Sequence, residues 1–173
     1  MHLSEHFTLG EVTKSSHQEV YNIPSHVAIE NLKRVCTWLE ELRRRYNELY
    51  VFPSFRPPRP SGSPPNSGGE EVTEEPIIIN SGYRSPELNK IVGGVPTSNH
   101  LTGCAVDIRV TGFEQAKRYR DILIEYANET KQDYDELLIE RNKSGSYWLH
   151  FAVRPKGNRR KTRDIIICKS SPS

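Results

Sequence analysis

The sequence of 173 residues predicts one α+β domain, in which a small mixed or antiparallel sheet packs against helices. Two observations lead to this fold class. Two segments have apolar residues at helical spacing, which predicts two amphipathic helices. Five short segments are rich in β-branched and aromatic residues or alternate between apolar and polar residues, which predicts strands. The chain length is typical of a single domain, so we expect residues 1–173 to form one.

The first predicted helix begins after Ser25, whose side chain is a suitable N-cap. Its apolar residues form one stripe at helical spacing, and charged residues fill the other faces. The stripe consists of Ala28, Leu32, Val35, Cys36, Leu39, Leu42 and Tyr46. A second helix is predicted from Phe113 to about Asn128. Both helices are expected to act as scaffold.

The strand patterns place polar residues on defined faces of the sheet. The continuous β-branched run at 77–80 predicts a central strand that is buried on both faces. In the segments 105–110 and 134–140, every second residue shares a face, and a turn at 142–146 leads to a further strand. That hairpin is expected to bring Glu140 or Glu136 near a histidine of the next strand. A last strand is predicted at 164–169, after an exposed basic segment at 156–161.

The segment at about 52–76 is predicted to be a flexible insertion without regular structure. It contains seven prolines and several glycines, which disfavour helices and strands. Three interpretations remain open for it: a lid, a partner-binding loop and a simple linker.

Composition excludes several classes of function. The formal net charge of +2 argues against a dedicated nucleic-acid binder, and no apolar run is long enough to cross a membrane. The N-terminus lacks the pattern of a secretory signal, so we expect synthesis in the cytoplasm without a signal peptide. We also expect the protein to be a monomer. The three cysteines do not form a disulfide framework. Cys104 is expected to pack in the interior, with a role as a fourth metal ligand as the alternative.

A candidate metal site rests on His100, Asp107 and His150. Imidazole nitrogens and carboxylate oxygens are zinc ligands, and a catalytic zinc usually takes three protein ligands and one water. His100 and Asp107 lie seven positions apart, and His150 lies within a later apolar strand. On spacing alone, the alternative interpretation is that His150 is a core histidine whose hydrogen bonds are satisfied, because short motif matches often arise by chance.

The residue types around these ligands resemble those of a known family. Ser98, His100, Gly103, Ala105 and Asp107 match the Ser-x-His-x-x-Gly-x-Ala-x-Asp pattern of the zinc D-Ala-D-Ala peptidases, and the Trp-Leu-His sequence at 148–150 follows it. That family comprises D-Ala-D-Ala carboxypeptidases and dipeptidases, phage endolysins and hedgehog-like domains. Residues 80–86 and 88–89 are similar to its approach to the site, and residues 3–9 are similar to the opening of the phage-type branch.

The resemblance implies one Zn²⁺ ion and hydrolysis of peptide bonds in peptidoglycan stem peptides or cross-links, of the D-Ala-D-Ala carboxypeptidase or endopeptidase type. It implies peptidoglycan peptides as partners and action at the cell wall after release or export. The bond that is cut stays open. The alternative is a non-catalytic zinc-binding module that binds the cell wall or a protein, as in hedgehog-like relatives.

One position departs from the family pattern. The related dipeptidases have a glutamate three residues before the last histidine, where this chain has Tyr147. We therefore predict Glu140 as the general base, with Glu136 as the second choice and an exposed strand-end charge as the structural alternative for Glu140. Arg84 is predicted to stabilise the oxyanion or bind a substrate carboxylate, unless it forms an ordinary salt bridge.

Two further residues are predicted to contact substrate, Ser98 and Tyr83. The alternative for Ser98 is that it only shapes the turn before His100.

Overall fold

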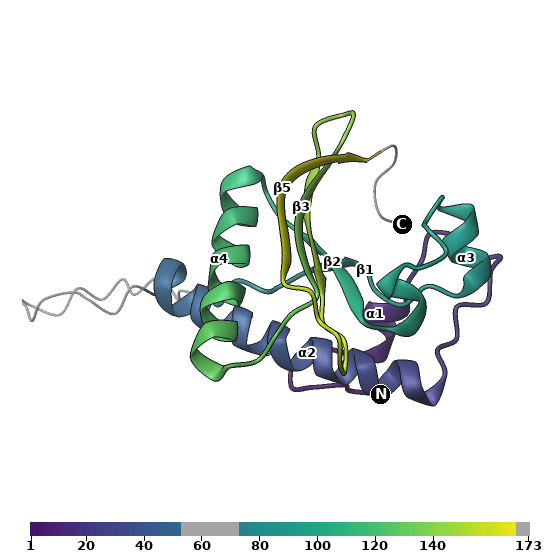
Figure 1. The fold of residues 1–173 in the computed structure, drawn as a ribbon, viewed down its shortest axis with the longest axis horizontal. Coiled ribbons are helices and arrows are strands. Elements are labelled where there is room, and N and C mark those ends of the chain that lie inside the picture. The colour runs from purple at the N-terminus through teal and green to yellow at the C-terminus, as the bar shows by residue number, and fades with distance from the viewer. Residues whose placement is uncertain (53–72, 169–173) are drawn as a thin grey trace, which may run out of the picture.

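A computed structural model describes residues 1–52 and 73–168 and contains a five-stranded mixed sheet packed against helices, which confirms the predicted α+β class (Figure 1). Most of the insertion predicted at about 52–76 lies outside the described residues. Within the described part of the chain, no helix is both long and apolar enough to span a membrane.

The strands occur in the order β1-β2-β4-β3-β5 across the sheet. Their bounds are β1 Ile79–Ser81, β2 Ala105–Arg109, β3 Glu136–Asn142, β4 Tyr147–Ala152 and β5 Lys161–Cys168. The first four strands pair antiparallel, and β5 pairs parallel with β3. The predicted hairpin of β3 and β4 is present, so residues of β3 lie beside those of β4 in a fixed register.

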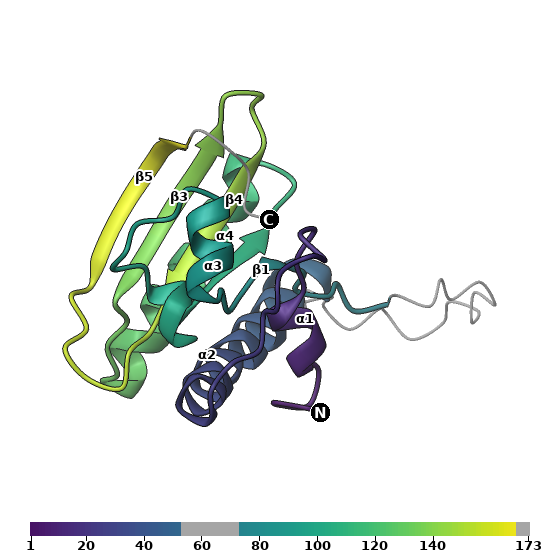
Figure 2. The ribbon, with the colours of Figure 1, turned by 90° about the vertical axis from the view of Figure 1, so that its right-hand side faces the viewer.

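Among residues 1–52 and 73–168, four α-helices pack around the sheet: α1 Leu9–Thr13, α2 His26–Tyr46, α3 Pro86–Ile91 and α4 Phe113–Thr130. A π-helical turn, η1 (Asn47–Val51), extends α2, and a 3₁₀ turn, η2 (Asn99–Thr102), precedes β2. The Ser25 side chain accepts a hydrogen bond from the Ala28 amide, so it is the N-cap that the sequence predicts. Figures 1 and 2 show α4 on one side of the sheet and α3 on the other, with α2 running along its lower edge.

The hydrophobic core lies between the sheet and the helices α2 and α4. Alternate residues of β2, β3 and β4 point into it, and they are joined by the apolar stripe of α2. The strand residues in this core are Val106, Ile108, Leu137, Ile139, Leu149 and Phe151. Because side chains alternate along a strand, the intervening residues face the opposite side of the sheet.

The prediction for the first strand was wrong in one respect. Its β-branched run does not form a central strand, because β1 lies at the edge of the sheet. Ile77 and Ile79 are buried, but Ile78 is 40% exposed. Ile77 and Ile79 are buried because they belong to the hydrophobic core, and α1 also packs against β1. A continuous apolar run therefore does not distinguish a central strand from an edge strand that is covered on one side.

Candidate metal centre

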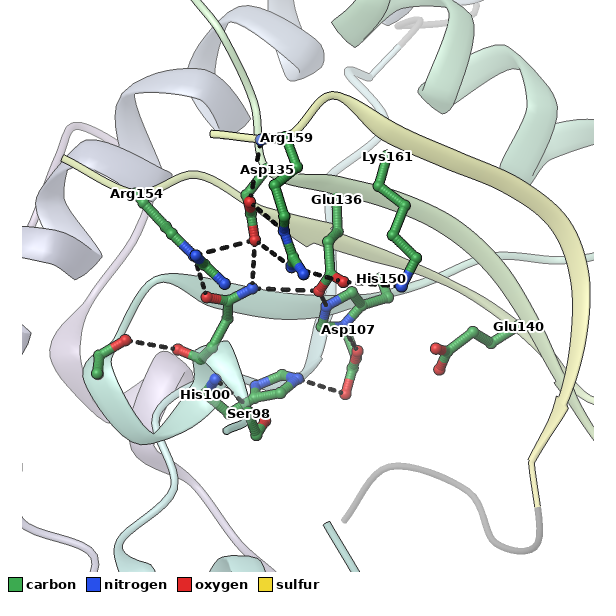
Figure 3. Close-up of polar contacts among 12 residues, drawn as sticks. Ser98, His100, Asp107, Asp135, Glu136, Glu140, His150, Arg154, Arg159 and Lys161 are labelled. Carbon is green, nitrogen blue, oxygen red and sulfur yellow. Dashed lines mark hydrogen bonds and ion pairs between the residues drawn. The ribbon is translucent and has the colours of Figure 1, made fainter. Parts of the chain in front are cut away.

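His100, Asp107 and His150 lie together on the sheet face opposite the core. All three are buried, with relative exposures of 3%, 2% and 8%. One potential ligand atom from each lies within 4.8 Å of the others, and within the described residues this is the group of three that could hold a metal ion. Figure 3 shows both imidazole rings next to the Asp107 carboxylate.

Strand register brings two of these residues together. Asp107 of β2 is directly opposite His150 of β4, and the two side chains share a face. Leu138 of β3 is the neighbour of His150 on its other side. His100 comes from η2, which begins after Ser98; the Ser98 hydroxyl accepts a hydrogen bond from the His100 amide. The alternation predicted from the sequence is therefore what places the aspartate and the histidine side by side.

Two glycines permit the close packing of the loops that hold His100. The Gly82 carbonyl lies 2.6 Å from His100 Nδ1. A Cβ atom on Gly82 would lie 2.2 Å from the Val12 carbonyl oxygen, so no larger residue fits there. Gly103 ends η2 with φ +70°, and a Cβ there would lie 2.5 Å from the Ala28 carbonyl oxygen. These glycines allow the backbone to fix the His100 ring with Nε2 toward Asp107, at 3.3 Å from Oδ2.

His150 has a carboxylate at each ring nitrogen. Nδ1 lies 2.8 Å from Asp107 Oδ1, and Nε2 lies 3.3 Å from Glu136 Oε2. Burial alone lowers the pKa of His150, but the hydrogen bonds with Asp107 and Glu136 outweigh it and raise the pKa to about 10.

The electrostatics of the other two ligands suit a metal ion. Burial lowers the pKa of His100, which favours the neutral imidazole that binds metals. Burial raises the pKa of Asp107, but the charge and hydrogen bonds of the two histidines more than compensate and hold it well below its usual range. The buried Asp107 carboxylate, beside two imidazole rings, favours a positive charge between the three side chains. A Zn²⁺ ion would supply that charge, and a His/Asp/His donor set fits it.

Arg84 directly contacts Asp107, one of the candidate ligands. Its Nη2 donates to Asp107 Oδ2 at 2.8 Å, and its Nε donates to Ser81 Oγ at 3.0 Å. The Arg84 side chain is mostly buried and also lines the cavity described next. It is therefore part of the site, and its observed contact is the ion pair that the sequence left as an alternative.

A cavity of about 490 Å³ opens over the three candidate ligands. One wall comes from the loop 93–99, and β3 and β5 form the other side. Ser98, Glu140 and Cys168 all line it. A metal bound by the three ligands would therefore be accessible from this cavity.

Glu140 lies on the cavity face of β3. Its Oε2 accepts a 2.7 Å hydrogen bond from Trp148 Nε1, and Figure 3 shows its carboxylate pointing toward Asp107. Burial raises the pKa of Glu140. Glu140 is thus not an exposed strand-end charge. Tyr147, by contrast, faces the helix layer, where its ring centroid lies 6.0 Å from that of Phe113.

Glu136 lies on the same face as Glu140 but in a network of charged groups. Besides His150, it contacts Arg159 at 2.9 Å and Lys161 at 3.2 Å. The hydrogen bond with His150 is the main reason that the pKa of Glu136 falls to about 2. Figure 3 shows these side chains converging on Glu136.

Sequence reasoning missed several residues of this network. Four of them line the cavity: Asn99, Arg154, Arg159 and Lys161. The fifth, Asp135, is buried behind them and contacts Asn99 and Arg159. The segment 156–161 was expected to be exposed and basic. Most of the segment is exposed, including Arg159. The sequence did not predict that Arg159 and Lys161 also line the cavity. The alternation of β3 was the one available signal, because it placed Glu136 on the site face. The partners of Glu136 come from distant segments whose approach no local pattern reveals.

Two other predicted residues lie away from the ligands. Tyr83 is buried in the hydrophobic core and is not among the residues that line the cavity. Cys104 is buried, and its thiol lies 3.9 Å from the Thr102 carbonyl oxygen; it is not in the ligand group. The Cys104 position agrees with the packing role expected for it.

Two histidines and an aspartate beneath an open cavity form a donor set that fits a single zinc ion with one coordination position left open. Residues 70–135 match the model of the family described as Peptidase M15, which confirms the resemblance to the zinc D-Ala-D-Ala carboxypeptidase-like peptidases. The matched range includes Arg84, His100 and Asp107, and His150 lies beyond it. The match supports a zinc-dependent metallopeptidase. No curated protein matches the chain.

Proposed function

We propose that this chain is a zinc metallopeptidase that hydrolyses peptide bonds in peptidoglycan stem peptides or cross-links. The observation that carries the proposal is the buried His100/Asp107/His150 group beneath an open cavity, with Glu140 on the same face. The Peptidase M15 match supports the peptidase reaction. The peptidoglycan substrate follows from the resemblance of the motif to D-Ala-D-Ala peptidases.

When bound, the zinc ion polarises the substrate carbonyl and lowers the pKa of a bound water toward about 7. Three residues would hold it: His100, Asp107 and His150. His100 would use Nε2, because its Nδ1 faces the Gly82 carbonyl.

Glu140 is the proposed general base. Its carboxylate is buried, which raises its pKa and makes it a stronger base than an exposed glutamate. Trp148 Nε1 fixes Oε2 at 2.7 Å, which orients the carboxylate on the cavity face. Glu140 would accept a proton from the attacking water and return it to the leaving amine.

Arg84 is proposed to act at the substrate carbonyl oxygen. Its contacts to Asp107 and Ser81 use two of the five N–H donors of a guanidinium. Because the side chain also lines the cavity, a remaining donor can stabilise negative charge that develops on the substrate. Ser98 lines the cavity as well and is proposed to contact substrate, although its hydroxyl also shapes the turn before His100.

The cavity wall favours an acidic peptide. Arg154, Arg159 and Lys161 line it from one side and are 33–48% exposed. A peptide with a free carboxylate, such as a stem peptide, would be attracted to this wall.

The second candidate function is a non-catalytic zinc-binding module. The observation in its favour is Tyr147, which stands where the related dipeptidases have their glutamate. The position of Glu140 weakens this alternative, because another strand supplies a carboxylate on the cavity face.

The test is digestion of purified peptidoglycan and of synthetic stem peptides by the zinc-loaded protein, with products identified by mass spectrometry. We expect release of terminal D-Ala or cleavage of cross-links, and loss of both in His150→Ala. A protein that binds one zinc ion but cleaves none of these substrates would refute the peptidase and leave the binding module.

A further inference from the structure

We propose that Glu136 is a positioning residue that holds the Nε2–H of His150 and thereby directs Nδ1 of that ring to the metal. The inference rests on the proposed zinc site. It also separates Glu136 from Glu140, which the sequence alone left as alternatives for the same role.

The geometry of His150 supports this assignment. Nδ1 lies 2.8 Å from Asp107 Oδ1, on the side of the ring where the other two ligands meet. Nε2 lies on the other side of the ring, 3.3 Å from Glu136 Oε2. A histidine ligand usually donates its second N–H to a carboxylate or carbonyl, which fixes its tautomer and orientation. Glu136 is placed to accept that hydrogen bond.

Glu136 is itself held by groups on both of its oxygens. Oε2 accepts from Asn99 Nδ2 at 3.1 Å in addition to its contact with His150. Oε1 lies 2.9 Å from Arg159 Nη2 and 3.2 Å from Lys161 Nζ. A carboxylate held by four donors cannot easily turn toward a substrate water. It is well suited to fix the orientation of a neighbouring ring.

A fully buried aspartate anchors this network. Asp135 has 0% exposure, and its Oδ2 accepts from Asn99 Nδ2 at 2.7 Å. Arg159 donates to both oxygens of Asp135, at 2.9 and 2.7 Å. Asn99 is adjacent to His100 in η2 and bridges Asp135 and Glu136. The network therefore links the segments that carry the two histidine ligands.

The two histidines are held in different ways. The outer nitrogen of His100 faces a backbone carbonyl, that of Gly82, at 2.6 Å. For His150 the nitrogen that points away from the metal position is Nε2, and it faces the Glu136 carboxylate. A hydrogen bond to a carboxylate makes the imidazole a stronger metal ligand than a hydrogen bond to a carbonyl does. Only the His150 partner can be changed by a side-chain substitution, so it is the one to test.

The experiment measures zinc affinity by competition with a chelator for wild type, Glu136→Ala, Glu136→Gln and Glu140→Gln. We expect Glu136→Ala to weaken zinc binding by about 10–100-fold, because the ring loses its acceptor. Glu136→Gln is expected to weaken it less, because its amide oxygen still accepts the Nε2–H. Glu140→Gln is the matched control on the same strand face and is expected to bind zinc as wild type does.

The substitutions also separate a positioning residue from a base. If Glu136 were a general base, replacement by glutamine and by alanine would abolish its function equally. If it is a hydrogen-bond acceptor, glutamine retains part of its function, because the amide oxygen still accepts. Wild-type zinc affinity in Glu136→Ala would overturn the proposal. A wild-type protein that binds no zinc would instead refute the proposed function, so the two failures are distinguishable.

A second measurement does not depend on any variant. Nitrogen-15 NMR of the zinc-loaded wild-type protein reports which His150 nitrogen carries the proton. We expect a proton on Nε2 and the metal on Nδ1. A proton on Nδ1 would overturn the proposal even if Glu136→Ala failed to fold.

Discussion

The two faces of the central sheet use the same strands in different ways. In β3, Leu137 and Ile139 point into the core between the sheet and the helices, while Glu136 and Glu140 point toward the cavity. In β4, Leu149 lies in the core, and its neighbour His150 is a ligand candidate. A shift of one residue in register would exchange the two sets of side chains.

The difference shows which interactions each face depends on. Apolar residues on the core face need only close packing, so their contribution is mainly to stability. Charged residues of the cavity and of the network behind it need partners, and Asp107, Glu136 and Asp135 each have at least two. We therefore expect substitutions on the two faces to affect different measurements.

The largest expected effect is on catalysis, in Glu140→Gln. Removal of a general base lowers kcat by about 10²–10⁴-fold. Zinc content and thermal stability should remain near wild type, because Glu140 is outside the ligand group. The measurement is steady-state hydrolysis of a stem peptide by the zinc-loaded variant. Activity within tenfold of wild type would show that another group acts as the base.

The core face is tested by Leu149→Ala. Leu149 is fully buried between the sheet and the helices, and truncation of such a residue costs about 2–5 kcal/mol. Urea unfolding should show this loss of stability, while the fraction that remains folded should bind zinc with unchanged affinity. A variant of wild-type stability that no longer bound zinc would contradict the separation of the two faces.

Much of this architecture was predictable because it depends on local patterns. The apolar stripe and Ser25 predicted α2 and its start, and strand alternation predicted that Asp107, His150, Glu136 and Glu140 point to specific faces. Those patterns are periodic, and each depends on residues that are close in sequence.

The parts that were not predictable depend on contacts between distant segments. The edge position of β1 follows from the strand order, which no local pattern encodes. Arg159 reaches Asp135 across 24 positions, and Asn99 reaches it across 36. Basic residues in a loop usually face solvent, so the cavity role of Arg159 and Lys161 required the structure.

A smaller effect is expected at Asp135, whose charge is buried but compensated. Burial raises its pKa, but hydrogen bonds from Arg159 and Asn99 outweigh this and lower it below the usual range. A carboxyl group with a lowered folded-state pKa stabilises the fold above its unfolded-state pKa of about 3.9, and this stabilisation is lost as the pH falls further.

Asp135→Asn should therefore lower stability at neutral pH by about 1–3 kcal/mol, because its partners lose a charged acceptor. Urea unfolding of the metal-free protein at pH 7 and below pH 4 measures this. The difference between wild type and variant should shrink at the lower pH. A difference that is constant with pH would show that the Asp135 charge does not contribute.

The smallest expected effect tests the register itself. Tyr147→Glu in the Glu140→Gln background puts a glutamate at the position used by the related dipeptidases. Tyr147 and His150 are separated by three positions in one strand, so their side chains point to opposite faces, and Tyr147 contacts Phe113 of α4. The new carboxylate would lie in the helix layer, and hydrolysis should stay at the level of Glu140→Gln alone. Recovery of activity would mean that residue 147 can reach the cavity, and that the two faces are less separate than the strand pairing of β3 and β4 indicates.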